Sequence, residues 1–209
     1  MARFSIFEKY SLLGIILLLL FIFSGCTARI QPNVSESEFL TSTIKKTGRA
    51  ELYITEEFRT YSVSKTDVMD MKKWQYELGP VSVDSFKYAL ASRFEKVDAK
   101  LGTPSFPKES DVDKDLLVIV EPAFSQFETH FPVAFKFETY KAVISFRVKA
   151  YDRTGKLVLE KVYEGVGGKR GSIGYESAGH AALPVAVKLA VKDAVGKAIS
   201  DIMEAIEKK

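Results

Sequence analysis

The chain has 209 residues, of which 46% are apolar and 27% charged, values typical of one or two ordinary globular domains. Its 30 Lys and Arg residues nearly balance 27 Asp and Glu residues, so the formal charge of +3 does not indicate a nucleic-acid partner. One cysteine excludes an internal disulfide and a Cys-based zinc site, and two histidines offer little for a metal. We therefore expect no cofactor.

Residues 1–25 are typical of a secretory signal peptide. Arg3 and Lys9 outweigh Glu8 in a short positive region, and the run 12–23, LLGIILLLLFIF, has no polar face. Its twelve residues reach about 18 Å as a helix, whereas a membrane span needs roughly 20 residues. A buried core helix, the alternative, would show a polar side. The length therefore favours a cleaved signal.

The apolar run ends in Phe23-Ser24-Gly25-Cys26, which resembles the lipobox of bacterial lipoproteins, usually Leu-Ala/Ser-Gly/Ala-Cys. Ser24, Gly25 and Cys26 match, and Phe23 stands where leucine is preferred. The resemblance implies that Cys26 is the lipidation site: it gains a diacylglycerol thioether, the signal is cut before it, and acyl chains such as palmitate modify the new amino group. Two or three chains anchor a protein far more firmly than one. The alternative for Cys26 is a free buried thiol.

The residue after the cysteine bears on localisation. Lipoproteins of enteric-type bacteria with Asp at this position tend to stay in the inner membrane, so Thr27 favours the outer membrane and a periplasm-facing protein. Residues 26–48 are polar and irregular, which predicts the lipidated cysteine and a flexible tether. A partner-binding strap is the alternative for this segment. We expect residues 49–209 to form one periplasmic domain.

The first half of that domain predicts a strand, a helix and a loop. Partial period-two alternation over 49–64 indicates one strand or two short ones. An amphipathic helix follows, with Asp84 or Ser85 as the N-cap and a loop over 102–115 behind it. The helix has its apolar stripe at Phe86, Leu90, Phe94 and Val97.

The second half predicts three strands. The continuous apolar run 116–120 suits a central strand buried on both faces, with Pro122 marking its end or a bulge. Residues 140–151 alternate between apolar and polar side chains, and a turn through Gly155 leads into a returning strand at 157–163. The Lys- and Arg-bearing face of this hairpin is expected to be solvated rather than an anionic-ligand site.

A long helix closes the chain, with Pro184 in its first turn and an apolar stripe rich in valine and alanine. The order strand, helix, three strands, helix predicts an α+β fold. We expect one mainly antiparallel sheet of about four strands with both helices on one face.

The glycine-rich run from Gly165 to Gly174 is interpreted as a loop between strand and helix. A P-loop would need glycine where Tyr163 stands and Ser or Thr where Arg170 stands, so we expect no nucleotide binding. A mobile cationic loop in which Lys169 and Arg170 contact a partner protein or an anionic glycolipid is the better interpretation.

No group of residues indicates catalysis. His130 and His180 are fifty residues apart and lie outside any metal-binding or triad pattern, so exposed positions are expected for both. The default for the aromatic residues near the strand ends is core packing, and the alternative is an exposed patch for a protein partner. These are Trp74, Tyr76, Phe131, Phe135, Phe137 and Tyr140.

The order of elements and the D-x-x-G hairpin turn at 152–155 resemble small periplasmic lipoproteins of the YajG and LptE kinds and transporter-auxiliary lipoproteins. The resemblance implies a non-enzymatic accessory or assembly factor of the cell envelope. It would have an envelope protein as partner and be held on the membrane through the acyl chains on Cys26. A lipid- or glycolipid-binding carrier is the alternative, followed by a lipid-anchored envelope hydrolase.

Overall fold

A computed structural model of the protein contains two β-sheets, and strands with alternating apolar and polar residues form the larger one. The structure describes residues 27–39, 46–66, 73–102, 115–130, 137–172 and 178–208. The chain divides into one small unit, Met1–Arg29 with Ser64–Gln75, and one large unit, Ile30–Val63 with Tyr76–Lys209. The signal segment and Cys26 lie outside the described residues.

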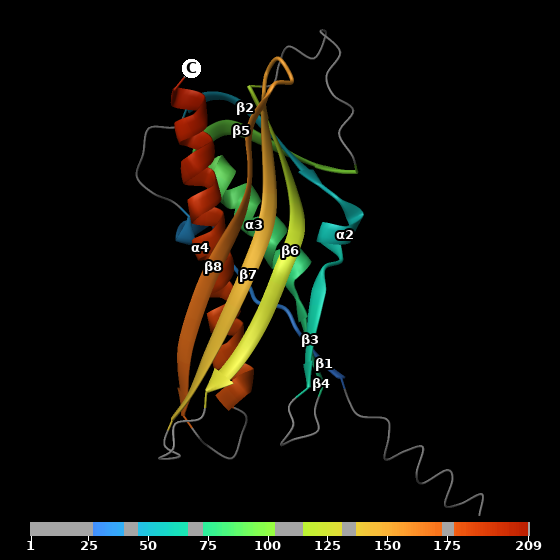
Figure 1. Ribbon diagram of the computed structural model, residues 1–209, viewed down its shortest axis with the longest axis vertical. Coiled ribbons are helices and arrows are strands. Elements are labelled where there is room, and N and C mark those ends of the chain that lie inside the picture. Colours follow the sequence, from blue (N-terminus) through green and yellow to red (C-terminus); the bar gives the residue numbers. More distant parts are fainter. Residues whose placement is uncertain are drawn as a thin grey trace, which may run out of the picture. The chain divides into compact units, whose positions relative to one another are not determined.

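The main sheet belongs to the large unit and mixes parallel and antiparallel pairs (Figure 1). Its strands are β2 (Lys46–Ile54), β5 (Phe94–Leu101), β6 (Leu116–His130), β7 (Phe137–Asp152) and β8 (Leu157–Ser172), in the order β5-β2-β6-β7-β8. Strand β2 runs parallel to both β5 and β6, whereas the pairs β6–β7 and β7–β8 are antiparallel. This leaves β5 and β8 as the two edges.

The α+β class is confirmed, but the expected sheet of about four mainly antiparallel strands is wrong. The unexpected strand is β5, because Phe94 and Val97 continue the helical spacing of the preceding segment. Helix α3 (Leu78–Ala91) instead begins earlier and ends at Ser92, whose hydroxyl donates to the Ala89 carbonyl at 2.7 Å. Since the α3 crossover joins β2 to β5, the two strands can run parallel.

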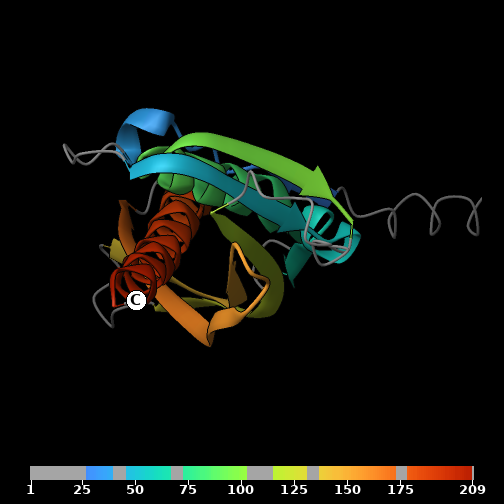
Figure 2. The ribbon, with the colours of Figure 1, turned by 90° about the horizontal axis from the view of Figure 1, so that it is seen from above.

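Both long helices, α3 and α4 (Ala178–Glu207), lie on one face of the main sheet, as expected (Figure 2). The alternation predicted for β7 is confirmed there: its inward side chains are all buried, namely Tyr140, Ala142, Ile144, Phe146, Val148 and Ala150. Phe146 contacts Phe58 and Phe86 edge to face, with ring centroids 5.7 and 5.5 Å apart. Edge-to-face pairs of this kind add to the hydrophobic stabilisation of the core.

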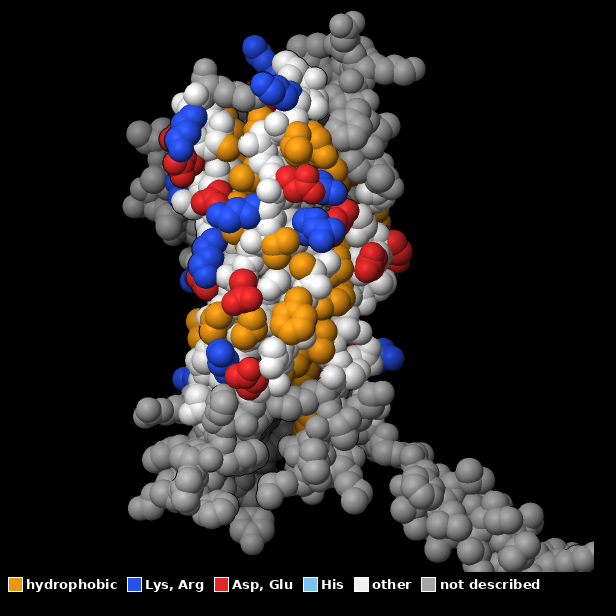
Figure 3. Space-filling view, viewed as in Figure 1, with side chains coloured by type: hydrophobic (Ala, Val, Ile, Leu, Met, Phe, Trp, Pro, Cys, Tyr) orange, Lys and Arg blue, Asp and Glu red, His pale blue; other side chains and the backbone are white. Residues whose placement is uncertain are grey.

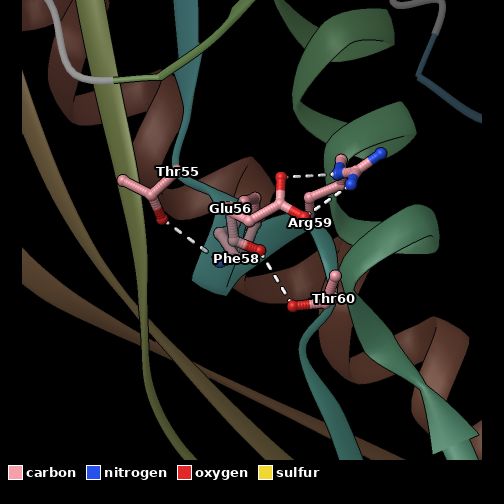
Figure 4. Close-up of polar contacts among 5 residues, drawn as sticks. All are labelled: Thr55, Glu56, Phe58, Arg59 and Thr60. Carbon is pink, nitrogen blue, oxygen red and sulfur yellow. Dashed lines mark hydrogen bonds and ion pairs between the residues drawn. The ribbon is translucent and has the colours of Figure 1, made fainter.

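A single helical turn, α2 (Glu56–Arg59), brings Phe58 into that core (Figure 4). The Thr55 hydroxyl accepts a hydrogen bond from the Phe58 N–H at 3.1 Å, which is an N-cap. At the other end, the Thr60 hydroxyl donates to the Glu56 carbonyl at 2.9 Å. The Arg59 guanidinium beside Glu56 holds the pKa of that exposed carboxyl below its usual value. The turn thus divides the segment 49–64 between two strands, which is the second of the two alternatives expected there.

Two local predictions in the hairpin region are confirmed. The β6–β7 register shifts between Pro122 and Phe124, which is the bulge expected at Pro122. At the β7–β8 turn, Gly155 has a φ of +78°, and the Asp152 carboxylate accepts hydrogen bonds from the Thr154 and Lys156 N–H groups at 2.9 and 3.1 Å. The turn therefore needs both its aspartate and its glycine.

The loop expected from Gly165 onward is wrong, because Gly165 to Ser172 form the second half of β8. Gly165 and Gly167 allow α4 to approach the backbone of β8 closely and do not form a turn. A Cβ atom on Gly165 would lie 1.9 Å from the Ala190 carbonyl oxygen, and one on Gly167 would lie 1.9 Å from that of Ala186. Helix α4 thus packs with its backbone directly against β8. Pro184 lies inside α4 rather than in its first turn, because the helix already begins at Ala178.

Part of the expected tether is secondary structure. Strand β1 (Thr27–Ile30) belongs to a three-stranded sheet in the order β1-β4-β3, with β3 (Ser62–Thr66) and β4 (Lys73–Glu77). The 3-10 turn η1 (Glu36–Glu38) lies in the large unit, where the Glu38 carboxylate pairs with Lys188 of α4 at 2.7 Å. Burial acts to raise the pKa of Glu38, but the hydrogen bond from Lys188 acts in the opposite direction and the pKa is lowered.

Candidate functional site

The structure describes only some of the candidate site residues predicted from the sequence. Cys26 lies outside the described residues, so its lipidation stays a prediction. Lys169 is exposed and pairs with Tyr140 across the β7–β8 ladder, and Arg170 pairs with Thr139. The side chain of Arg170 lies outside the described ones. A partner contact at these two residues would therefore involve a strand, not a mobile loop.

An open groove of about 320 Å³ runs along the seam where the free edge of β8 meets α4. Its lining is mostly polar or charged and comprises Lys161, Val162, Tyr163, Glu164, Lys197, Ser200 and Asp201. The Asp201 carboxylate accepts hydrogen bonds from Lys161 at 2.8 Å and from the Tyr163 hydroxyl at 3.0 Å. These bonds join one end of β8 to the last turns of α4.

A second pair of side chains from α4 binds the backbone of the β8 edge. The Asp193 carboxylate accepts the Val166 N–H at 3.1 Å, and the Lys197 ammonium donates to the Glu164 carbonyl at 2.8 Å. Lys197 and Asp193 also pair with each other at 2.8 Å. Unpaired N–H and C=O groups at a sheet edge can recruit another strand, and these two side chains satisfy such groups here.

Hydrogen bonds to lysine determine the ionisation of both aspartates at the seam. The Lys161 hydrogen bond, assisted by Tyr163, lowers the pKa of Asp201 against the effect of burial. Burial also acts to raise the pKa of Asp193, but the Lys197 and Val166 hydrogen bonds outweigh it and lower that pKa. Burial first, and then the Asp201 carboxylate, raise the pKa of Tyr163. Both carboxylates are thus anions engaged in structural pairs, unsuited to act as general acids near neutral pH.

The described residues do not assemble a catalytic or metal-binding group. Among these residues, no three His, Cys, Asp or Glu side chains are placed to hold a metal ion. His130 belongs to β6 and His180 to α4, but their side chains lie outside the described ones. Ser200 in the groove has no described histidine beside it as a base. The direct contact of β8 with α4 at Gly165 and Gly167 leaves no space for an acyl chain between these elements.

Aromatic residues predicted to pack in the core do so where the structure describes them. Trp74, Tyr76 and Tyr140 are buried, and the Tyr76 and Phe127 ring centroids are 4.9 Å apart. Phe131 and Phe135, and the side chain of Phe137, lie outside the described part.

The exposed apolar residues on the sheet are different ones. They are Leu101 and Leu157 at strand ends, and Phe124, Val162 and Val166 within strands. The last three face away from the helices. The alternation of Val162 and Val166 with Glu164 is visible in the sequence, but their exposure depends on how β6, β7 and β8 pair.

Comparison with known proteins gives a likeness in fold only. No protein-family model matches the chain, and neither does any curated protein sequence. Protein XCC0632 from Xanthomonas campestris, of family DUF330, has a TM-score of 0.51 at 10% identity over 88% of this chain and 98% of its own. This similarity supports the α+β architecture.

Two further solved structures are more distant. A protein from Caulobacter crescentus described as a candidate lipoprotein has a TM-score of 0.40 at 13% identity, over 63% of this chain and 85% of its own. Lipoprotein GNA1162 from Neisseria meningitidis has a TM-score of 0.23 at 10% identity, over 78% of this chain and 99% of its own. The structural neighbours thus include named lipoproteins. Among the described residues of the present chain, no helix has the length and apolar character to cross a membrane.

Proposed function

We propose that this chain is a lipoprotein of the bacterial cell envelope, anchored in the outer membrane through acyl chains on Cys26 and facing the periplasm. It acts there as a non-enzymatic accessory or assembly factor through protein contacts. Residues 1–25 are its signal peptide, and the residues after Cys26 join the lipid to the folded part of the chain, which already includes η1 and the start of β2.

The single observation that carries the proposal is the sequence Ser24-Gly25-Cys26 directly after the twelve-residue apolar run. A lone cysteine at the end of a signal-like segment is the position at which a lipoprotein is cut and acylated. Acyl chains contribute about 0.8 kcal/mol per buried methylene, so two or three of them suffice for stable anchoring.

The accessory role is supported by the character of the described surface. Its groove is lined by carboxylates and lysines that bind one another, as at Asp201 and Lys161, rather than by a nucleophile with its base. Exposed apolar side chains lie instead on the sheet, as is common for proteins that act by binding other proteins.

Membrane fractionation of cells making the full chain tests the anchor. We expect the wild-type protein in the outer-membrane fraction, and Cys26→Ala to leave that fraction and keep its signal. Thr27→Asp should move the protein toward the inner membrane, whereas the matched control Thr27→Ser should not. Equal membrane retention of wild type and Cys26→Ala would contradict lipid anchoring at this residue.

A further inference from the structure

The face of the main sheet that points away from α3 and α4 holds exposed apolar side chains on β6 and β8. Phe124, Val162 and Val166 are 51, 50 and 46% exposed. Strand register relates their positions: Phe124 of β6 and Glu164 of β8 both pair with Ser145 of β7, and Val162 pairs with Arg147. Val166 pairs with the half-buried Val143 in the adjacent row. We call Phe124, Val143, Val162 and Val166 the outer patch.

Figure 3 shows hydrophobic side chains at several places on this face, with acidic and basic side chains among them. Val143 and Val166 are cross-strand neighbours, whose Cβ atoms lie about 4.5–5.5 Å apart, and Phe124 is diagonal to Val143, within reach of an aromatic side chain. Val162 lies on the other side of Glu164, opposite Arg147. Exposed apolar side chains grouped with charged ones on a sheet face are a candidate interaction site.

The charges around the outer patch are mostly paired within the sheet. Glu128 pairs with Lys141 at 3.6 Å on one side, and Lys149 lies 3.9 Å from Glu160 on the other. Glu164 differs, because no ion pair joins its exposed carboxylate to any residue that the structure describes; only its backbone carbonyl is engaged, by Lys197. The Glu164 carboxylate lies between Val162 and Val166 on the same strand face, with Arg147 of β7 opposite Val162.

The adjacent edge of β8 is closed to strand addition at this point. Asp193 and Lys197 already bind the Val166 N–H and the Glu164 carbonyl, the groups that an added strand would use. A partner must therefore approach the face of the sheet.

We propose that the outer patch is where this chain binds its envelope protein partner, through a segment that places apolar side chains around a Lys or Arg paired with Glu164. This inference rests on the proposed accessory function and names its binding surface. The negative charge of Glu164 favours a partner of this kind over two alternatives, a second copy of the chain and an anionic lipid surface. A second copy related by a two-fold axis through Glu164 would oppose two carboxylates, and an anionic lipid surface would be repelled by the same group.

Photo-crosslinking in cells tests the surface, with the full-length lipidated protein carrying benzoylphenylalanine at Val162. The matched control carries it at Leu189, which is similarly apolar and 42% exposed but lies on α4. We expect an adduct from position 162 alone, and mass spectrometry should place it on a partner segment with apolar residues and a Lys or Arg.

Charge variants decide whether Glu164 determines the binding. Glu164→Lys should reduce the adduct at position 162 about tenfold or more, because like charges in an interface repel. Glu164→Gln should give a smaller loss. Replacing the crosslinked partner's Lys or Arg by Glu should restore the adduct with Glu164→Lys. Circular dichroism of each variant, with the wild-type spectrum expected, checks that the fold is kept.

Several outcomes would overturn the inference: an adduct with a second copy of this chain, one with phospholipid alone, equal protein adducts at positions 162 and 189, or an unchanged yield with Glu164→Lys. If Leu189 alone captures a partner, the accessory function stands and this surface is wrong. If neither Val162, Leu189 nor any other exposed position captures a protein, both the surface and the accessory function fail.

Discussion

The two faces of strand β8 differ in their side chains: the inner face packs against α4, and the outer face is exposed. On the inner face, Gly165 and Gly167 have no side chains and the backbone of α4 fills the space. On the outer face, Val162 and Val166 project into solvent on either side of Glu164. Because successive strand residues point to opposite sides, one sixteen-residue strand meets both demands. The inner residues are explained by packing, whereas we propose that the outer ones bind a partner.

The largest expected effect concerns the inner face. Gly165→Ala would place a Cβ atom 1.9 Å from the Ala190 carbonyl oxygen and 2.5 Å from the Ala194 nitrogen, so α4 must move away. We expect the free energy of unfolding to fall by about 3 kcal/mol, the upper range for overpacking, measured by urea denaturation.

Gly168→Ala is the matched control for that experiment, because the nearest atom to its Cβ would be the Tyr140 carbonyl oxygen at 3.9 Å. It should be neutral or stabilising by up to about 1 kcal/mol, as alanine is favoured over glycine in a strand. Equal destabilisation by the two substitutions would contradict the close approach of α4 to β8.

The second effect concerns the edge between the two faces. The double variant Asp193→Ala, Lys197→Ala removes the side chains that bind the Val166 N–H and the Glu164 carbonyl. We expect a loss of about 1 kcal/mol in stability and concentration-dependent self-association in analytical ultracentrifugation, since an open strand edge recruits other strands. The control Glu204→Ala, Lys208→Ala removes an ion pair at the end of α4 and should stay monodisperse. Identical sedimentation of the two double variants would show that the edge is not protected in this way.

The third effect depends on pH. Because Lys161 and Tyr163 lower the pKa of Asp201 below its ordinary value of 3.8, this carboxylate contributes stability above that pH and loses it as the pH falls through the lower folded value. Asp201→Asn should therefore cost at most about 1 kcal/mol at neutral pH, since the pair is partly exposed. The difference in the free energy of unfolding between Asp201→Asn and wild type should disappear as the pH falls toward about 2. A difference that persists in acid would contradict the charge contribution of Asp201.

The smallest effect on stability is expected on the outer face. Val162→Thr and Val166→Thr keep β-branched side chains on exposed strand positions, so the free energy of unfolding should change by no more than about 0.5 kcal/mol. Partner crosslinking from position 124 should nevertheless decline. Loss of stability comparable to that of Gly165→Ala would place these valines in the core and remove their role in binding.

The sequence predicts the parts of the fold that depend on local patterns. Alternation identifies β7, the D-x-x-G turn identifies the β7–β8 hairpin, and Pro122 marks the bulge. Strand β5 is missed because Phe94 and Val97 also suit a helix, and only pairing with β2 shows otherwise. The glycines of β8 predict a loop until the alanines of α4 are seen against them.

The candidate sites divide in the same way. Lys169 and Arg170 are predicted as contact residues because of their charge, but the segment that holds them is a strand. The outer patch depends on three strands in register, and Phe124 and Val166 lie more than forty residues apart in the chain. No local pattern joins such positions. The exposure that distinguishes a binding surface from a core strand is a property of the folded sheet.

Mass spectrometry of the N-terminal tryptic peptide of the membrane-purified protein is the sharpest test of lipid anchoring at Cys26. Trypsin cuts after Arg29, so we expect the peptide Cys26-Thr27-Ala28-Arg29 carrying a diacylglycerol thioether and an acylated amino group. A peptide running from Tyr10 to Arg29 with an unmodified cysteine would contradict this expectation, because the signal would then be retained and the protein would lack its lipid anchor.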